Sequence, residues 1–433
     1  MKASINDPIM EFKVLRNSPC SVLFLVLVVS SLSLLFILLS SNPSATIIEP
    51  KQQSIGNTDQ NSSNFSSSIA QPPIDEDEDE VECDLFAGRW VRDAARPVYT
   101  NSTCTMMPSA RNCAAHGKGM QHALWRWKPD GCELQRFDPV DFLSTVRGKK
   151  MAFVGDSLAR NQMESLLCLL SQAATATPED AYNGYSKFQT WHYPSHDFTL
   201  LFIWAEFLVE AKERTDANGT GTDAFDLHLD RVSPVWAEKL PELHYLIISA
   251  GNWFIRKNYL YDDGNLIGCV LCNNNDEDVK DLGLGYAVRR AFRTSLEHIS
   301  RCRDCDDNLV TLLRTFSSNH FEDGGWFDGR CNRTEPLSEV EVRSAAPQRH
   351  WDFRTVQVEE MGRMKEGSER EGKGRMEVLD VTKAMMLRAD GHPGASSLAT
   401  RSDCLHWCLP GPVDMWNDVL LATLKKKRKR PLL

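Results

Sequence analysis

The sequence is short of basic residues, and no internal repeat is visible along it. Its 49 lysines and arginines are outnumbered by 59 aspartates and glutamates, so the formal net charge is −10 at pH 7. This balance argues against broad nucleic-acid binding, which requires a basic surface, and the lack of repeats excludes a solenoid. With 42% hydrophobic and 25% charged residues, the 433-residue chain is not wholly disordered. Its length suits one large catalytic domain with accessory segments.

Charge is also missing from a long stretch near the N-terminus. Residues 21–39 are apolar or serine, and no lysine or arginine lies between Arg16 and Lys51. A helix of about 20 such residues spans a bilayer, and the basic residues before it predict a cytosolic N-terminus. We therefore expect a cytosolic tail at 1–20, a single-pass type II signal anchor at 21–40 and a luminal remainder. A cleaved signal peptide is the alternative, but the apolar run exceeds the roughly 7–15 residues usual for one.

Thirteen cysteines fit an oxidising luminal compartment. Cys20 lies at the edge of the apolar run, and the other twelve lie between Cys83 and Cys408, an even number that predicts a disulfide framework. The Cys-x-x-Cys pairs at 269–272 and 302–305 also have the spacing of a four-thiolate zinc site. The compartment disfavours that alternative, so we expect no metal. Sequons for N-glycosylation fit a luminal chain as well, and they lie at Asn61, Asn64, Asn101, Asn218 and Asn332.

Composition divides the luminal part into three segments. Residues 41–82 are rich in polar residues, end in an acidic run and lack apolar periodicity, so we expect a disordered stem. Residues 83–137 are rich in cysteine and tryptophan and predict a small disulfide-stapled module. Its tryptophans either stack on sugar rings or fill a small core. Residues 138–433 form the expected catalytic domain, and the basic run at its end, 425–430, is expected to be solvated.

Within 138–433, short apolar runs alternate with stretches of helical periodicity. This alternation is typical of the α/β class, with a central parallel sheet flanked by helices. The charged, glycine-rich stretch 366–374 is expected to be a surface loop. Strands are predicted at 151–154, 198–204, 243–248, 309–313 and 376–381, and helices at 158–170, 286–299 and 413–424.

The motif Gly155-Asp156-Ser157 follows a predicted buried strand and precedes a predicted helix. Such a turn presents the serine at the carboxyl end of a strand, where open α/β sheets bind their ligands. The N-terminus of the helix offers N–H groups and a positive dipole end to an oxyanion. The motif therefore predicts a serine nucleophile, which needs a base and a group that orients the base.

The segment from Asp403 to Cys408 offers both partners. Asp403 and His406 are three residues apart, so one turn can bring the carboxylate onto the imidazole. Cys404 and Cys408 would pin that turn by disulfides, which would fix the catalytic geometry. The alternative is that Asp403 caps a helix and His406 is a surface residue.

These motifs resemble the GDSL/SGNH esterase fold, and further motifs narrow the resemblance to the plant trichome birefringence-like family. The resemblance covers roughly residues 83–424. The further motifs are Cys83-Asp-Leu-Phe-x-Gly88-x-Trp90, Trp125-Arg126-Trp127-Lys-Pro, Arg160-Asn161-Gln162, Leu312-Leu-Arg314-Thr315 with His320-Phe321, and Asp403-Cys-Leu-His406-Trp-Cys-Leu-Pro-Gly-Pro412.

The resemblance implies a Golgi type II polysaccharide O-acetyltransferase. By it, Ser157 would form an acetyl-enzyme, His406 would act as general base and Asp403 would orient the imidazole. The donor would be acetyl-CoA or another acetyl carrier, with no bound cofactor, and the acceptor a hydroxyl of a cell-wall hemicellulose. The extra Cys-x-x-Cys pairs look most like the xyloglucan-acting branch, for which the acceptor would be side-chain galactose. The residues implied to position the oxyanion or the substrate are Gly155, Asp156, Arg160, Asn161, Gly251 and Asn252.

Asn252 departs from the family, which usually has histidine there. Three other activities stay open: a xylan or mannan acetyltransferase, an acetyl esterase of the same fold, and a non-catalytic protein that binds wall polysaccharides. The resemblance also implies that Cys404 and Cys408 link back to Cys331 and the N-terminal module. The shared cysteines of the family match Cys83, Cys104, Cys113, Cys132, Cys168, Cys331, Cys404 and Cys408.

Overall fold

The computed structural model describes residues 83–93, 95, 97–179, 186–272, 279–345, 347–371, 374–395 and 402–426. The predicted cytosolic tail, anchor and stem, with Asn61 and Asn64, lie outside these residues, as does most of the basic run at 425–430. No helix within the described ranges is long and apolar enough to cross a membrane.

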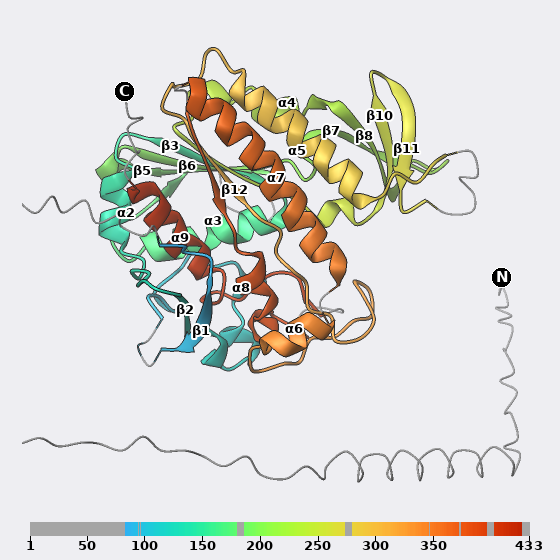
Figure 1. Cartoon of the computed structure of the whole chain (residues 1–433). Helices are drawn as coiled ribbons and strands as arrows, with labels where there is room; N and C mark the ends of the chain where they lie inside the picture. Colours follow the sequence, from blue (N-terminus) through green and yellow to red (C-terminus); the bar gives the residue numbers. More distant parts are fainter. Residues whose placement is uncertain are drawn as a thin grey trace, which may run out of the picture. The chain divides into compact units, whose positions relative to one another are not determined.

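A seven-stranded sheet forms the centre of the fold (Figure 1). Its order is β13 (Arg375–Leu379), β12 (Val310–Arg314), β9 (Tyr245–Ser249), β3 (Lys150–Gly155), β6 (Phe198–Trp204), β5 (Phe188–Tyr193) and β4 (Thr177–Pro178). The five strands from β13 to β6 are parallel, which confirms the predicted central parallel sheet. β5 and β4 extend it as antiparallel strands, an extension that the sequence did not indicate.

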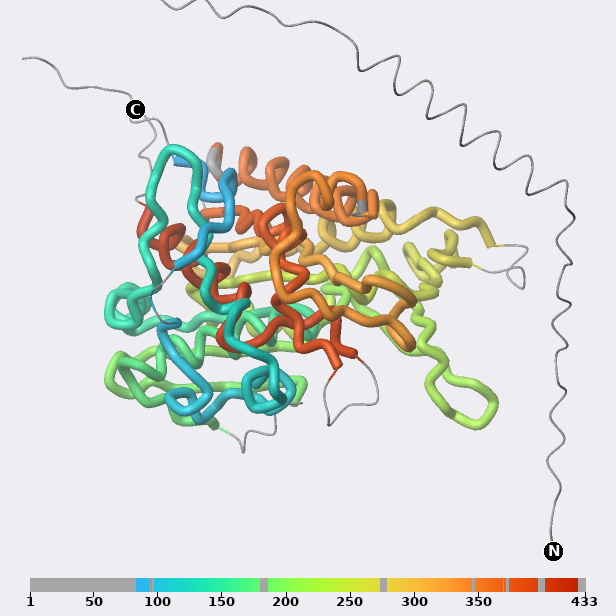
Figure 2. Tube along the Cα trace, turned by 90° about the horizontal axis from the view of Figure 1, so that it is seen from below, coloured from blue at the N-terminus to red at the C-terminus, as the bar shows by residue number. Residues whose placement is uncertain are grey.

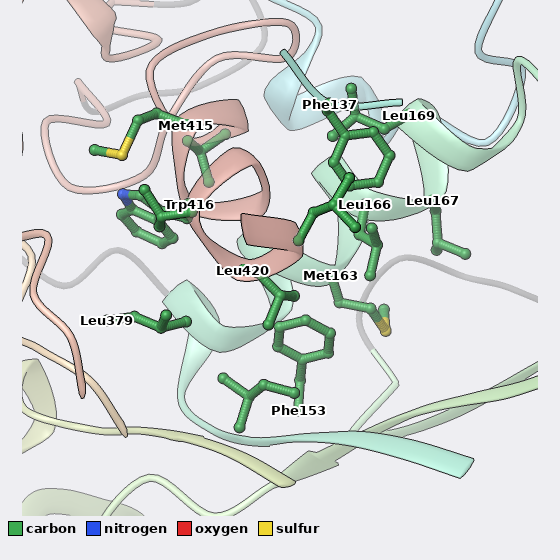
Figure 3. Close-up of a cluster of buried hydrophobic side chains, with 14 of the residues drawn as sticks. Phe137, Phe153, Met163, Leu166, Leu167, Leu169, Leu379, Met415, Trp416 and Leu420 are labelled. Carbon is green, nitrogen blue, oxygen red and sulfur yellow. The ribbon is translucent and has the colours of Figure 1, made fainter. Parts of the chain in front are cut away.

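Helices cover both faces of the parallel strands, as such strands require. α3 (Ser157–Leu170) and α9 (Asp414–Lys425) pack on one face, and α5 (Leu284–Ser300) and α7 (Gln348–Glu371) on the other. Successive side chains of a strand point to opposite faces. Phe153 of β3 therefore lies in the core formed with α3 and α9 (Figure 3), while Val154 lies in the core formed with α5 and α7. The predicted strands and helices all occur, with boundaries within about two residues.

A second, four-stranded sheet packs beside α5 and was not predicted. Its order is β11 (Asn265–Val270), β10 (Lys257–Asp262), β8 (Gly221–Val232) and β7 (Val209–Thr215). One of its faces adds apolar side chains to the α5 core, including Leu227 and Leu260. Short helices complete the described part: α2 (Pro139–Thr145), α4 (Pro234–Ala237), α6 (Glu339–Ala345) and α8 (Thr382–Met386).

The N-terminal module is built on a two-stranded ribbon, β1 (Gly88–Arg92) and β2 (Trp125–Pro129). Trp127 is buried, and its indole N–H donates to the carbonyl of Leu85 at 2.9 Å. The Trp90 indole donates to the carbonyl of Ala384 in α8 at 2.8 Å. These tryptophans therefore fill the junction with the catalytic part, the second of the two alternatives. Figure 2 shows the module, in blue and cyan, beside the C-terminal segments in red.

Disulfides join the module to the rest, which confirms the predicted framework. Each Cys-x-x-Cys pair closes on itself, so these four cysteines offer no thiolates to a zinc ion. Asn101, Asn218 and Asn332 are exposed, as glycan attachment requires. The other pairs are Cys83–Cys132, Cys104–Cys168, Cys113–Cys408 and Cys331–Cys404.

The prediction of a surface loop at 366–374 is wrong for most of that stretch, because α7 continues to Glu371. The helix is held upstream, where the buried carboxylate of Glu360 accepts from Arg289 at 3.0 Å and from Arg293 at 2.7 Å, both of α5. With that anchor, a charged stretch remains helical without an apolar face of its own. Arg370 adds a bond within the helix, to the carbonyl of Glu366 at 3.0 Å.

Asp418 of α9 should make stability depend on pH. Burial, with the nearby charge of Asp414, raises the pKa of Asp418 to about 7, against about 3.9 for an unfolded aspartate. The raised value means that its contribution to stability is complete below pH 4 and is lost as pH rises through 7. We expect Asp418→Asn, whose Oδ1 still accepts from the Phe137 N–H, to raise the melting temperature at pH 8.

The comparison should be made by thermal unfolding at pH 5 and pH 8. The gain from Asp418→Asn should be smaller at pH 5, where the wild-type carboxyl is protonated. The exposed Asp304→Asn serves as the control for a one-unit change in net charge. Equal gains at both pH values would contradict the raised pKa.

Candidate active site

The end of β3 places Ser157 at the start of α3. Gly155 has φ +154°, and a Cβ there would lie 1.8 Å from the carbonyl oxygen of Ser249, so the turn requires glycine. Asp156 caps the helix, because its Oδ1 accepts from the N–H of Leu158 at 2.9 Å. Burial raises the pKa of Asp156, and the charge of Arg314 opposes the rise. The buried carboxyl group of Asp156 thus stabilises the turn that presents Ser157.

The structure brings together the three predicted catalytic residues. His406 Nε2 lies 2.7 Å from Ser157 Oγ, and His406 Nδ1 lies 2.9 Å from Asp403 Oδ2. Asp403 Oδ1 also accepts from the backbone N–H of His406 at 3.0 Å, so the two residues form one tight turn. With its Nδ1–H donated to the carboxylate, the imidazole has Nε2 free to take the proton of the serine hydroxyl.

The electrostatics of the pair suit a general base. Burial lowers the pKa of His406, as does the charge of Arg111, while Asp403 opposes both. Burial alone would raise the pKa of Asp403, but the charge and hydrogen bond of His406, with the charge of Arg111, hold it well below its usual range. Asp403 therefore stays ionised, and the lowered pKa of His406 favours the neutral imidazole, the form that can accept a proton.

Arg111 is a residue of this site that the sequence did not indicate. It belongs to the N-terminal module, is buried, and its guanidinium lies 3.0 Å from Asp403 Oδ2. Its Nε lies 3.8 Å from the buried Glu164 of α3. Its carbonyl accepts from the N–H of Leu409 at 2.9 Å. The module thus contacts the catalytic turn through an ion pair and a backbone bond, and through the nearby Cys113–Cys408 disulfide.

Arg111→Met should lower kcat by about 10- to 100-fold, because Asp403 Oδ2, which accepts from His406 Nδ1, loses the charged donor that also holds it in place. The acid limb of the pH–rate profile should move to higher pH. The reason is that Arg111 lowers the pKa of His406, so without that charge the imidazole protonates at a higher pH and is lost as a base there. The measurement is the initial rate of acetyl transfer across pH.

Arg89→Met is the matched control, because Arg89 of the same module pairs with Asp130 on the surface. Arg111→Lys should recover part of the rate and of the profile. A lower melting temperature with an unmoved acid limb would assign Arg111 a purely structural role.

The residues expected to position the oxyanion divide into two groups. Asn161 is buried and bonded to both backbone groups of Trp407, with its Oδ1 2.7 Å from the N–H. It therefore holds the catalytic turn, and it is not among the residues that line the cleft. Arg160 lies over the ring of Trp204, 5.5 Å from its centroid, beside Glu164.

Gly251 and Asn252 follow β9, whose end pairs with the end of β3. Asn252 contributes to the cleft that holds Ser157, and its Nδ2 donates to the carbonyl of Ser317 at 3.4 Å. A Cβ on Gly251 would lie 2.7 Å from the ring of Phe316, so a larger residue would shift that ring. Asn252 therefore lines the same cleft as Ser157, and Gly251 follows the strand end that pairs with Gly155.

Ser157 and His406 open into a cleft of about 800 Å³. Trp204, Trp253 and Arg256 line one part of it, and residues 318–327 another. No group of side chains able to hold a metal ion occurs within the residues that the structure describes. The cleft is large enough for a sugar chain beside the serine.

Comparison with known proteins identifies the family of the chain. Residues 134–423 match the GDSL/SGNH-like acyl-esterase family found in Pmr5 and Cas1p. The chain belongs to this family. Residues 81–133 match the PMR5 N-terminal domain, which corresponds to the module that carries Arg111.

Individual relatives agree with this membership of the acyl-esterase family. The chain is 47% identical to xyloglucan O-acetyltransferase 3 of Populus trichocarpa, over 80% of this chain and 87% of the relative. It is 44% identical to xyloglucan O-acetyltransferase 4 of the same species, over 93% of this chain and 92% of the relative. It is 43% identical to xyloglucan O-acetyltransferase 2 of Arabidopsis thaliana, over 83% of this chain and 85% of the relative. The resemblance inferred from the motifs is confirmed, and the chain is a polysaccharide O-acetyltransferase.

Proposed function

We propose that the chain transfers acetyl groups to a cell-wall hemicellulose through an acetyl ester on Ser157, with the side-chain galactose of xyloglucan as the acceptor. The observation that carries the proposal is the contact of Ser157, His406 and Asp403 at the base of a cleft in an O-acetyltransferase fold.

The geometry supports a two-step reaction. Ser157 Oγ attacks the carbonyl of the acetyl donor while His406 Nε2 takes the hydroxyl proton, and the leaving group of the donor then departs with that proton. The acceptor hydroxyl next attacks acetyl-Ser157, and His406 takes its proton and returns it to Ser157 Oγ. Asp403 keeps Nδ1–H oriented and stabilises the imidazolium in both steps. The Ser157 N–H, at the start of α3, and the groups at Gly251 and Asn252 are placed to stabilise the oxyanions.

Transfer is favoured over hydrolysis when the site positions the acceptor and excludes water. The names of the relatives support xyloglucan as the glycan. The apolar stretch at residues 21–39, with Arg16 before it, supports a single-pass type II anchor that faces the catalytic part into the Golgi lumen. The disulfides and exposed sequons fit that compartment.

The test incubates the detergent-solubilised full chain with an acetyl donor and oligosaccharides of xyloglucan, xylan or mannan, and reads products by mass spectrometry. Acetyl-CoA and a second acetyl carrier are tried in parallel, so that a wrong donor is recognised. Acetylation of xyloglucan at galactose is the expected result. Acetylation of xylan or mannan alone would correct the glycan. Release of free acetate without a glycan product would indicate an esterase, and glycan binding without either product would indicate a binding protein.

A further inference from the structure

Two polar side chains in the wall of the cleft have no partner. Ser318 and His350 are each 1% exposed, and both line the cleft that holds Ser157. Within the described residues, the hydroxyl of Ser318 and both ring nitrogens of His350 make no hydrogen bond. Buried polar groups are almost always paired, and an unpaired one is costly. Their presence together in one cleft points to a ligand that supplies the missing partners.

Ser318 is held next to the catalytic turn, and His350 is held in a helix. Ser318 follows Ser317, whose Oγ accepts from the Trp407 indole at 3.1 Å. His350 lies in the first turn of α7, and its ring lies 5.1 Å from that of Phe316. Burial lowers the pKa of His350 to about 3, so its imidazole is neutral and offers one donor and one acceptor. A serine hydroxyl and a neutral imidazole match sugar hydroxyls, which donate and accept in the same way.

The rim of the same cleft carries exposed aromatic rings. Trp326 is 45% exposed and Phe327 74% exposed, and both line the cleft. Their loop is closed by a backbone bond from Glu322 N–H to Arg330 O at 2.8 Å, and the Cys331–Cys404 disulfide ties it to the catalytic turn. Large aromatic side chains on a surface commonly mark a binding site. Their flat faces fit the C–H face of a pyranose ring.

Charge in the cleft wall favours a neutral ligand. Arg256 is paired with Asp223 at 2.6 Å, and Arg333 is paired with Glu341 at 2.9 Å. Because these two guanidinium groups already have carboxylate partners, they add little attraction for an anionic sugar. Arg349, the third arginine of the lining, is exposed, and the exposed Glu322 of the same lining carries the opposite charge.

We propose that Ser318 and His350 bind hydroxyls of the acceptor beside Ser157, while Trp326 and Phe327 stack on an adjoining sugar ring. The four residues form a subsite for a neutral polysaccharide. This inference rests on the proposed function and names the part of the cleft that holds the acceptor.

The test measures binding of a xyloglucan oligosaccharide by calorimetry, in full-chain protein that carries Ser157→Ala so that no chemistry occurs. Adding Ser318→Ala or Trp326→Ala should raise Kd by about tenfold each, the effect of one hydrogen bond or one ring contact. Matched controls are Ser295→Ala, a buried unpaired serine of α5, and Phe188→Ala, an exposed aromatic residue of β5. Both lie outside the cleft and should leave Kd unchanged.

Folding gives a second readout for the same variants. Because Ser318 Oγ is buried and has no partner within the described residues, Ser318→Ala should keep or raise the melting temperature of the parent while it weakens binding. His350→Phe, which keeps a ring of similar shape, should act in the same direction on Kd. Equal Kd values for the parent, Ser318→Ala and Trp326→Ala would overturn the subsite. If the parent binds no oligosaccharide of xyloglucan, xylan or mannan, the proposed acceptor fails instead.

Discussion

Replacing Ser157 by alanine will lower kcat for acetyl transfer by about 10⁴- to 10⁶-fold, the loss seen when a serine nucleophile is removed from such a site. The physical reason is that Oγ, which lies 2.7 Å from His406 Nε2, is the atom that would carry the acetyl group in the proposed reaction. Wild-type protein mixed with the donor alone should gain the mass of one acetyl group, located by peptide mapping at Ser157. The variant should show no such adduct.

Ser144→Ala, an exposed serine of α2, controls for the loss of a hydroxyl elsewhere. A Ser157→Ala protein that transfers acetyl groups within tenfold of the wild-type rate would rule out the acetyl-serine step. Direct attack of the acceptor on the donor, with His406 as base, would then be the remaining use of this geometry.

Replacing Asp403 by asparagine should lower kcat by about 10³- to 10⁴-fold. Asp403 Oδ2 accepts from His406 Nδ1 at 2.9 Å and from Arg111 at 3.0 Å, and Oδ1 accepts from the backbone N–H of His406 at 3.0 Å, so both oxygens face donors. An amide NH₂ placed there would face one of those donors, which would favour the wrong imidazole tautomer. It would also remove the negative charge that stabilises the imidazolium.

The measurement is kcat at several pH values, with the exposed Asp304→Asn as control for the chemical change. Binding of the acceptor should change far less than kcat, because Asp403 lies behind the imidazole and not against the sugar. A loss of less than tenfold at all pH values would contradict the role of Asp403 as the group that orients His406.

The two halves of the candidate triad could be predicted because the signal for each is local. Gly155, Asp156 and Ser157 form one turn, and Asp403 and His406 are three residues apart, so spacing brings the atoms within each motif into reach. The contact between the two motifs spans 249 positions, and the family resemblance predicted it. Arg111 could not be predicted, because it meets Asp403 across 292 positions of sequence. No local pattern marks an arginine whose partner comes from the far end of the chain. The bonds of Asn161 to Trp407 could not be predicted for the same reason, because only the folded chain brings the two residues together.

The helices and strands of the fold also divide into those with a local sequence signal and those without one. The apolar strands and amphipathic helices of the central sheet carry their own periodicity, whereas α7 and the second sheet do not. The composition of the charged end of α7 is typical of a loop. In the folded chain this end stays helical because Glu360, upstream in α7, is bonded to the arginines of α5. Strands β7 and β8 of the second sheet are about half exposed and carry many charged residues, so their apolar positions become evident only when α5 covers them.

The link from Arg111 and Cys113 to the catalytic turn bears on how such enzymes can be recombined. The two matched family segments meet at residues 133 and 134, yet that junction runs between parts that share one charge network and one covalent bond. Chimeras of related acetyltransferases that exchange the segments there would pair an arginine and a cysteine from one parent with a carboxylate and a cysteine from another. An exchange that keeps this ion pair and this disulfide intact therefore moves residues 83–426 together.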